Sequence, residues 1–291
     1  MMSAQESSEA VLIGLRPVRT RQGALSLWRR VCQNVPPMKA QKTSLLSLLF
    51  LVLIFTLSGC VYLRLLEVKN QLADFDHHFR VELSGGHFIL HFLHPILFKE
   101  DFTELTKLNP SRIHPLAEGY QWFLDFHQEG GNKEAKQAEK TIVFQLHFNG
   151  DHRLESWDFS PLFVEMAPPA FLEASIRSLG KGKVLERSQQ LRVDSENLPK
   201  VSAEPPTRKS ITAVLGIPAY RFSKSGLDAY VYRFKAEALP IKSKYEDRRI
   251  AEAKLYFDPA TDQLAKMSSR FAGLKISIDF RKLTEGATTP P

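Results

Sequence analysis

One pattern of helix and strand signals occurs twice in this chain of 291 residues, at a separation of about 108 residues. Each copy starts with a short segment whose apolar residues recur at helical spacing, and a proline ends that segment. Three stretches of alternating apolar and polar residues follow, which is typical of antiparallel strands with one face on a core. The repeat therefore predicts an α+β fold of two tandem units, each a short helix plus an antiparallel three-stranded meander.

Particular positions of the two copies correspond. In the first copy, the helix and the three strands are expected over residues 101–105, 120–127, 141–148 and the residues after Leu154. In the second copy, they are expected over residues 210–214, 230–235, 251–257 and the residues after Leu264. The matched pairs are Thr103 with Thr212, Phe126 with Phe234, Phe148 with Phe257, and Leu154 with Leu264. The match is one of pattern more than of identity.

The second copy also resembles a known family. Its helix segment Ser210 to Pro218 reads SITAVLGIP, and Tyr256-Phe257-Asp258-Pro259 follows with Leu264 behind it. This arrangement is similar to the small outer-membrane assembly lipoproteins of the SmpA/OmlA (BamE-like) type, and the tandem is similar to periplasmic inhibitors that bind hydrolases across a concave sheet. The first copy departs from the pattern, because Leu108-Asn109-Pro110 lacks the glycine and residues 129–140 lengthen its hairpin. The resemblance implies a binding module at an envelope surface, with no catalytic residue carried over.

An apolar run from Ser44 to Cys60, SLLSLLFLVLIFTLSGC, follows the basic residues Lys39 and Lys42. A basic start, an apolar core and small residues before a cut form a secretory signal, which we place at residues 38–59. Its end resembles a lipobox made of Leu57, Ser58 and Gly59, and this resemblance implies that Cys60 is acylated, with palmitate among the acyl groups. The alternative is a single membrane-spanning helix from Ser44 to Leu66, since about twenty apolar residues cross a bilayer. In both interpretations the N-terminus stays in the cytoplasm.

The remaining segments follow from these assignments. Helical spacing over residues 61–75 predicts a juxtamembrane helix, and alternation on both sides of Gly85-Gly86 predicts a hairpin. A polar, proline-bearing stretch at residues 194–208 suggests a linker. The expected organisation is a disordered segment or an overlong gene start at 1–37, the signal peptide at 38–59, a first α+β unit at 60–200, a second at 201–283, and a disordered tail at 284–291.

The net charge of +7 comes mostly from the leader. Residues 1–59 hold seven Lys or Arg and two Asp or Glu, which leaves 32 basic and 30 acidic residues from Cys60 onward. No basic cluster interleaved with aromatic residues is apparent, so we expect no nucleic-acid partner. The part from Cys60 onward has a single cysteine, so no disulfide within it is possible and its stability must come from burial.

All nine histidines lie between His77 and His152, and His87, His91 and His94 precede Pro95 closely. Imidazole nitrogens on one sheet face could hold zinc or copper. His87 and His91 would share a face, but four strand residues span about 13 Å, which is too far for one shared ion. We therefore expect no metal or other cofactor, with these three histidines as the candidates if a metal does bind.

No phosphate-binding glycine loop, Gly-x-Ser-x-Gly elbow or His-Glu-x-x-His motif occurs, and the second copy has no histidine to act as a base. We therefore expect a protein without enzymatic activity. The expected function is that of a bacterial envelope lipoprotein, at the outer membrane facing the periplasm, that acts as a binding or assembly module for another envelope protein. The alternatives are a ligand- or metal-binding periplasmic lipoprotein and a single-pass membrane-anchored protein. A broad sheet face bearing aromatic residues would favour the binding or assembly module, and a deep, polar-lined cavity would favour the ligand-binding lipoprotein.

Overall fold

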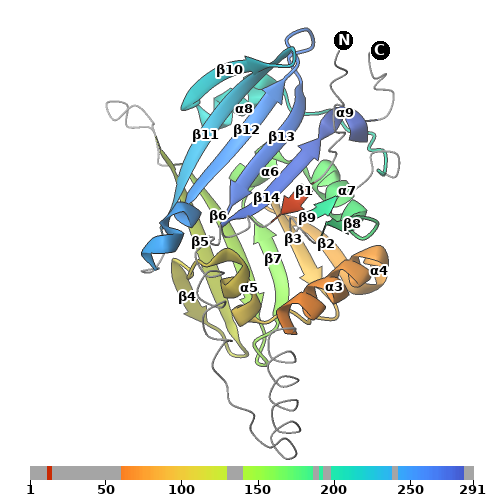
Figure 1. The fold of residues 1–291 in the computed structure, drawn as a ribbon, viewed down its shortest axis with the longest axis vertical. Helices are drawn as coiled ribbons and strands as arrows, with labels where there is room; N and C mark the ends of the chain where they lie inside the picture. Colours follow the sequence, from red (N-terminus) through yellow and green to blue (C-terminus); the bar gives the residue numbers. More distant parts are fainter. Residues whose placement is uncertain are drawn as a thin grey trace, which may run out of the picture.

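The strands of this protein form one antiparallel sheet, as Figure 1 shows. The computed structural model describes residues 12–14, 60–129, 140–185, 190–192, 198–237 and 242–284. The first half of the sheet contains β2 (Phe79–Ser84), β3 (His87–Phe92), β4 (Arg112–Pro115), β5 (Tyr120–Glu129), β6 (Thr141–Phe148) and β7 (Leu154–Phe159). The second half contains β10 (Tyr220–Lys224), β11 (Leu227–Glu237), β12 (Ile250–Phe257), β13 (Leu264–Phe271) and β14 (Leu274–Asp279). Three short strands extend it beyond β14: β1 (Leu12–Gly14), β9 (Gln190–Arg192) and β8 (Lys183–Leu185).

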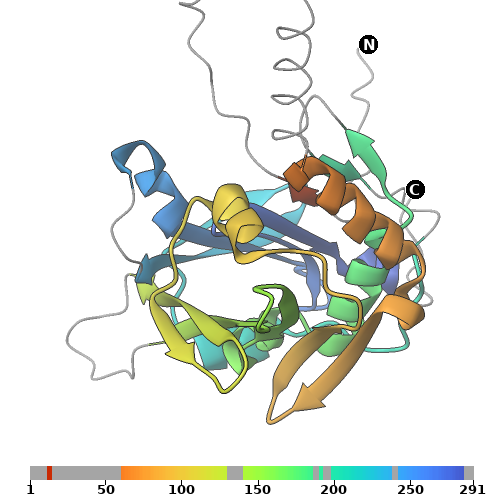
Figure 2. The same cartoon turned by 90° about the horizontal axis from the view of Figure 1, so that it is seen from below.

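The order of strands across the sheet is β2-β3-β7-β6-β5-β11-β12-β13-β14-β1-β9-β8, with β4 paired to β5 and β10 paired to β11. The sheet curls, and short helices lie within the curl and along its rim (Figure 2). α6 contacts β3 and β6 of the first half, while α7 contacts β14 of the second half. The helices are α3 (Cys60–Ala73), α4 (Phe75–His78), α5 (Lys99–Thr106), α6 (Pro161–Met166), α7 (Pro169–Leu179), α8 (Arg208–Leu215) and α9 (Phe280–Leu283), with a 3-10 helix at Ser243–Arg249.

The two sequence copies meet where β5 pairs with β11. Glu129 lies opposite Arg233, and Asp125 lies opposite Glu237. Glu237 follows Glu129 by 108 positions, and Arg233 follows Asp125 by the same 108 positions. Exchanging the two copies therefore maps this pairing onto itself, so the register has an approximate two-fold symmetry. The short strands β4 and β10, which precede the long strands, hold equivalent places beside the pairing.

The helix that opens each copy begins and ends through local hydrogen bonds. In α8, the Thr207 side chain accepts a hydrogen bond from the Ser210 backbone N–H at 3.1 Å, and the Ser210 hydroxyl in turn accepts one from the Thr207 N–H. The helix ends at Gly216, whose φ of 74° suits glycine. In α5, Lys107 takes the corresponding place with φ 59°, in the left-handed region. Lys107 is therefore the C-cap residue of α5, at the position that Gly216 occupies in α8.

One hydrophobic core runs through both halves. Phe271 of β13 is 3% exposed, and its ring centroid lies 5.2 Å from that of Phe126 in β5 and 5.4 Å from that of Phe144 in β6. It also contacts Phe163 of α6 at 5.8 Å and Phe234 of β11 at 5.8 Å. The contacts with Phe126, Phe144 and Phe163 are edge-to-face, and such contacts stabilise a core beyond the burial of area alone. The buried aromatic residues of the two copies therefore form one cluster.

The predicted fold class is wrong. The chain does not form two tandem units of a short helix plus a three-stranded meander, because β5 and β11 join the copies into a single curled sheet with one core. The hairpin of β2 and β3 then extends this sheet past β7. Alternation in a sequence shows which side chains share a face, but the free edge of a meander carries unpaired backbone groups that favour pairing with another strand. Here the free edge of each copy pairs with the other copy, through β5 and β11.

The other predicted segments have varied outcomes. The hairpin around Gly85-Gly86 is present as β2 and β3, and the helix expected over residues 61–75 runs from Cys60 to Ala73 as α3. Near the proposed boundary at residue 200, Leu198 is buried and Val201 pairs with Thr284. Within the expected disordered segment 1–37, the structure describes only β1. The signal peptide at 38–59 and residues 285–291 lie outside the described residues.

Within the described residues, no helix combines the length and the apolar character that crossing a bilayer requires.

Candidate functional site

Aromatic and basic side chains alternate over the outer surface of strands β10 to β13, on the side away from the core. In β12, Ala251, Ala253, Leu255 and Phe257 are buried, so the residues between them point outward. β13 shows the same alternation, and the pairing of β10 with β11 places Tyr220 and Phe222 on this side of the sheet. We call this surface the basic aromatic face and define it as Tyr220, Phe222, Lys224, Arg233, Lys235, Lys254, Tyr256, Lys266 and Arg270, all of them exposed or half-buried.

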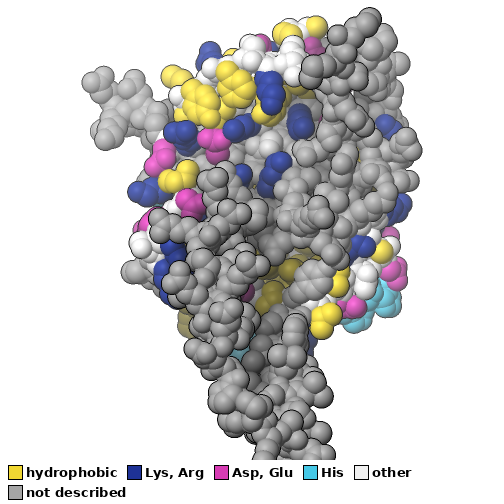
Figure 3. All heavy atoms as spheres, in the orientation of Figure 1, with side chains coloured by type: hydrophobic (Ala, Val, Ile, Leu, Met, Phe, Trp, Pro, Cys, Tyr) yellow, Lys and Arg dark blue, Asp and Glu magenta, His cyan; other side chains and the backbone are white. Residues whose placement is uncertain are grey.

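Strand pairing brings these residues together from distant parts of the chain. Tyr256 lies opposite Lys266 of β13, and its ring centroid lies 6.3 Å from that of Phe222 in β10. The Phe222 and Tyr220 rings stack at 6.2 Å, and the Arg233 guanidinium lies 5.3 Å from the Tyr220 ring centroid. In Figure 3, yellow and dark blue side chains gather over the part of the molecule where Figure 1 draws β10, β11 and β12. The face is therefore a continuous, mixed apolar and cationic surface.

Carboxylates also lie on this side of the sheet, with Glu252 inside the face and Glu129, Glu237 and Asp279 at its margin. The oxygens of Glu252 accept hydrogen bonds from the Tyr220 hydroxyl at 3.2 Å and from Arg233 Nε at 3.5 Å, and Lys254 Nζ lies 2.9 Å away. Burial opposes the ionisation of Glu252, but these donors outweigh it and lower its pKa. The hydrogen bond to Glu252 likewise raises the pKa of Lys254. Both groups are therefore charged at neutral pH, and the six basic residues of the face outnumber these four carboxylates.

Two hollows lie at equivalent places in the two copies. One has a volume of about 410 Å³ beside α8, and its lining includes Arg208, Lys209 and Arg221. The other has a volume of about 350 Å³ beside α5, and its lining includes Glu100 and Glu104. Both open broadly to solvent, so neither is the deep, polar-lined cavity that would favour a ligand-binding function. The two hollows differ in charge, because Asp262 is the acidic residue among the three basic ones of the first, and Lys99 is the basic residue beside the two acidic ones of the second.

The residues predicted for lipidation lie at the edge of the described chain. Cys60 is the first residue of α3, while Leu57, Ser58 and Gly59 lie outside the described residues. Four residues further on, Arg64 of α3 forms a bidentate ion pair with Asp101, with Nε to Oδ2 at 2.7 Å and Nη2 to Oδ1 at 2.5 Å. Any group carried by Cys60 would therefore be joined closely to the folded body.

The three histidines considered as metal candidates are not brought together. His87 Nδ1 lies 2.8 Å from Asp158 Oδ1, and His91 Nε2 lies 2.9 Å from Glu82 Oε2, so each has a carboxylate partner across the sheet. His94 lies apart from both and instead contacts His77 and His78. The sequence prediction missed this second grouping. The signal was present, because a hairpin that pairs Phe79 with Phe92 also brings the residues just outside that pair together.

The basic aromatic face was also missed. A near-balanced charge from Cys60 onward and the absence of a local basic cluster suggested no such surface. The face forms because each strand contributes one or two cations on one side and apolar residues on the other. Pairing then adds the cations of separate strands. The near-balanced charge of the chain from Cys60 onward therefore does not show that cations gather on the outer side of β10 to β13.

Comparison with protein-family models, with curated proteins and with solved structures finds no match for this chain.

Proposed function

We propose that this protein is a bacterial envelope lipoprotein that acts as a non-catalytic binding or assembly module at the periplasmic face of the outer membrane. The observation that carries the proposal is the basic aromatic face. Tyrosine and arginine are enriched in protein interfaces, and a paired sheet presents them on a rigid backbone. The cations of the face favour a partner with an acidic surface, because complementary charge promotes encounter and selects the partner.

The anchor is supported by the sequence Leu57-Ser58-Gly59-Cys60 and by the place of Cys60 at the start of α3. α3 packs against α7 and is tied to α5 through Arg64 and Asp101. A lipid on Cys60 would hold the sheet close to the membrane through a short, ordered connection. The proposed partner is then another protein of the same envelope compartment.

The anchor has a structural consequence that can be measured. Cleavage before Cys60 would remove β1, which lies between β14 and β9. An uncleaved single-pass anchor would keep residues 12–14 in the chain but on the cytoplasmic side, apart from β14 and β9. We expect intact-mass measurement of the envelope protein to give a chain that starts at Cys60 and carries acyl groups, and the Cys60→Ser variant to lose palmitate labelling. A chain that retains residues before Cys60 and carries no acyl group would support the single-pass alternative.

The binding role is tested by site-specific photo-crosslinking in living cells. A crosslinking phenylalanine analogue replaces Phe222 or Tyr256 on the basic aromatic face. It replaces Gln145 of β6 as a matched position on the outer surface of the first half. We expect the same acidic envelope protein to be captured from both face positions and not from position 145.

A charge-reversal variant completes this test. Lys224→Glu combined with Lys235→Glu should abolish the capture from position 222, while the thermal unfolding midpoint stays near that of the parent, because both side chains are exposed. Equal capture at position 145, or capture that the charge reversal leaves unchanged, would contradict a role for the face. Capture of lipid or nucleic acid alone would contradict the protein partner.

A further inference from the structure

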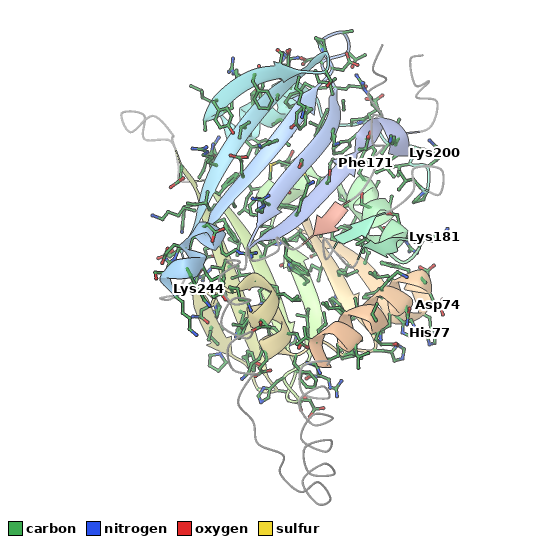
Figure 4. The ribbon with its side chains drawn as sticks, in the orientation of Figure 1. Asp74, His77, Phe171, Lys181, Lys200 and Lys244 are labelled. Atoms are coloured by element: carbon green, nitrogen blue, oxygen red, sulfur yellow. The ribbon has the colours of Figure 1, made fainter. Side chains whose placement is uncertain are left out.

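Three histidines form a cluster at one corner of the molecule. His77 and His78 are the last residues of α4, and His94 follows β3. The ligand nitrogens of the three side chains all lie within 4.8 Å of one another. Figure 4 labels His77 on the outside of this corner, and histidine side chains gather at the same edge in Figure 3.

The rings are arranged as a compact set. His78 Nδ1 and His94 Nδ1 lie 3.1 Å apart. The His77 ring stacks on that of His94 with a centroid distance of 5.1 Å and meets the His78 ring edge-on at 4.7 Å. No carboxylate belongs to the cluster among the described residues, in contrast to His87 and His91, which each have one. The cluster therefore has three imidazole nitrogens that could ligate a metal ion, and its other side is open to solvent.

The backbone beneath the rings is held in place. The Leu93 N–H donates a hydrogen bond to the His78 carbonyl at 2.8 Å, which ties the end of α4 to the residues after β3. The Gln71 side-chain amide donates to the His94 carbonyl at 3.1 Å, and Gln71 is 4% exposed. The buried rings of Phe75 and Phe79, which stack at 5.2 Å, fix both ends of α4. Only the imidazole rings need to turn for their nitrogens to converge.

We propose that His77, His78 and His94 bind a divalent transition-metal ion, Zn²⁺, with solvent in the remaining position. Zinc takes imidazole nitrogens at about 2.0–2.1 Å in a tetrahedral arrangement, which places neighbouring ligand nitrogens about 3.4 Å apart. The 3.1 Å between His78 and His94 is close to this separation. Mg²⁺ and Ca²⁺ prefer oxygen ligands, so this set selects against them. The bound ion would join α4 to the β2 and β3 hairpin.

The test uses the full chain in detergent, made metal-free with a chelator and purified without a histidine tag. Zn²⁺ is titrated in competition with a chromogenic chelator. We expect one equivalent bound per chain, a higher unfolding temperature with Zn²⁺, and no effect of Mg²⁺. Co²⁺ in place of Zn²⁺ should give a visible spectrum typical of a four- or five-coordinate site with nitrogen ligands.

Variants assign the ligands. His78→Ala and His94→Ala should each weaken Zn²⁺ binding at least tenfold, because the loss of one of three ligands leaves an incomplete set. His87→Ala and His91→Ala, on the same hairpin, serve as matched controls and should bind as the parent does. Circular dichroism checks that every variant is folded. Absence of stoichiometric binding by the parent, or unchanged affinity in folded His78→Ala and His94→Ala variants, would overturn the proposal.

Discussion

Asp279 is placed at the end of β14, and its side chain accepts a hydrogen bond from the Lys282 backbone N–H at 3.3 Å at the start of α9. Burial raises the pKa of this carboxyl, and the Lys282 N–H together with the charges of Lys282, Lys266 and Arg281 offsets the burial only in part. The folded state therefore holds the proton more tightly than the unfolded state. Its stability should fall as the pH rises through the raised pKa, because ionising Asp279 in the fold costs free energy.

The first prediction concerns Asp279→Asn. Asparagine keeps the capping oxygen and has no charge to bury, so the variant should be more stable than the parent at pH 7. The difference should vanish in acid, where Asp279 is protonated in both states. Denaturant unfolding of both proteins between pH 3 and pH 7 measures it.

Asp258 provides the matched control with the opposite sign. Hydrogen bonding to the Ala260 backbone N–H and an ion pair with Arg281 lower the pKa of Asp258 despite some burial. Asp258→Asn should therefore reduce stability at pH 7, and this difference too should vanish in acid. If Asp279→Asn behaves as Asp258→Asn does at pH 7, the burial of Asp279 does not control its charge.

At the scale of elements, one ion pair joins α3 to α5. Asp101 is 1% exposed, and its carboxylate accepts hydrogen bonds from Arg64 of α3 and, at 2.9 Å, from the Phe98 backbone N–H. Arg64 also lies over the Phe98 ring, 5.1 Å from its centroid. Removing Arg64 would leave a buried carboxylate with a single donor among the contacts described. Such a group is expensive to keep in a low-dielectric site.

The second prediction is that Arg64→Ala lowers the free energy of unfolding by about 3 kcal/mol, since it breaks a buried pair from one side. Arg233→Ala is the control, because Arg233 is half exposed and its contact with Glu252 is long, at 3.5 Å. That change should cost less than about 1 kcal/mol. Denaturant unfolding compares the two variants, and an equal loss in both would show that the Arg64 pair is no stronger than a surface contact.

The elements themselves were largely readable in the sequence. Helical spacing gave the position of α3, and the glycine pair marked the turn between β2 and β3. Alternation in β12 identified Ala253, Leu255 and Phe257 as the buried side. These features depend on contacts between residues close in sequence, for which local periodicity is a sufficient guide. The partner of each strand was not readable, because pairing depends on edges that are distant in sequence.

At the scale of the whole molecule, the core joins both halves through Phe271. Its ring contacts Phe126 and Phe144 of the first half and Phe234 of the second. Trp122 and Trp157, by contrast, both lie in the first half. The third tryptophan, Trp28, precedes Cys60, so in a chain that starts at Cys60 tryptophan fluorescence reports on strands that do not contain Phe271.

The third prediction is that Phe271→Ala lowers the free energy of unfolding by about 3–5 kcal/mol. The loss measured by tryptophan fluorescence should equal the loss measured by hydrogen exchange of the β12 and β13 amides. A single core should unfold as one unit. Ile250→Ala is the control, because Ile250 is 40% exposed, and it should change stability by less than about 1 kcal/mol. A tryptophan transition that does not move with Phe271→Ala would show that the halves unfold independently.

By itself, the sequence indicated a helix and three long strands in each copy, the buried side of β12, and the candidate anchor at Cys60. Tertiary structure alone decided that the copies fuse across β5 and β11, that cations and aromatic rings from separate strands share one face, and that His94 lies with His77 and His78. The physical reason is the same in each case. Periodicity shows which side of an element is buried. Strand pairing and the contact between the end of α4 and the residues after β3 depend instead on residues from separate elements of the chain.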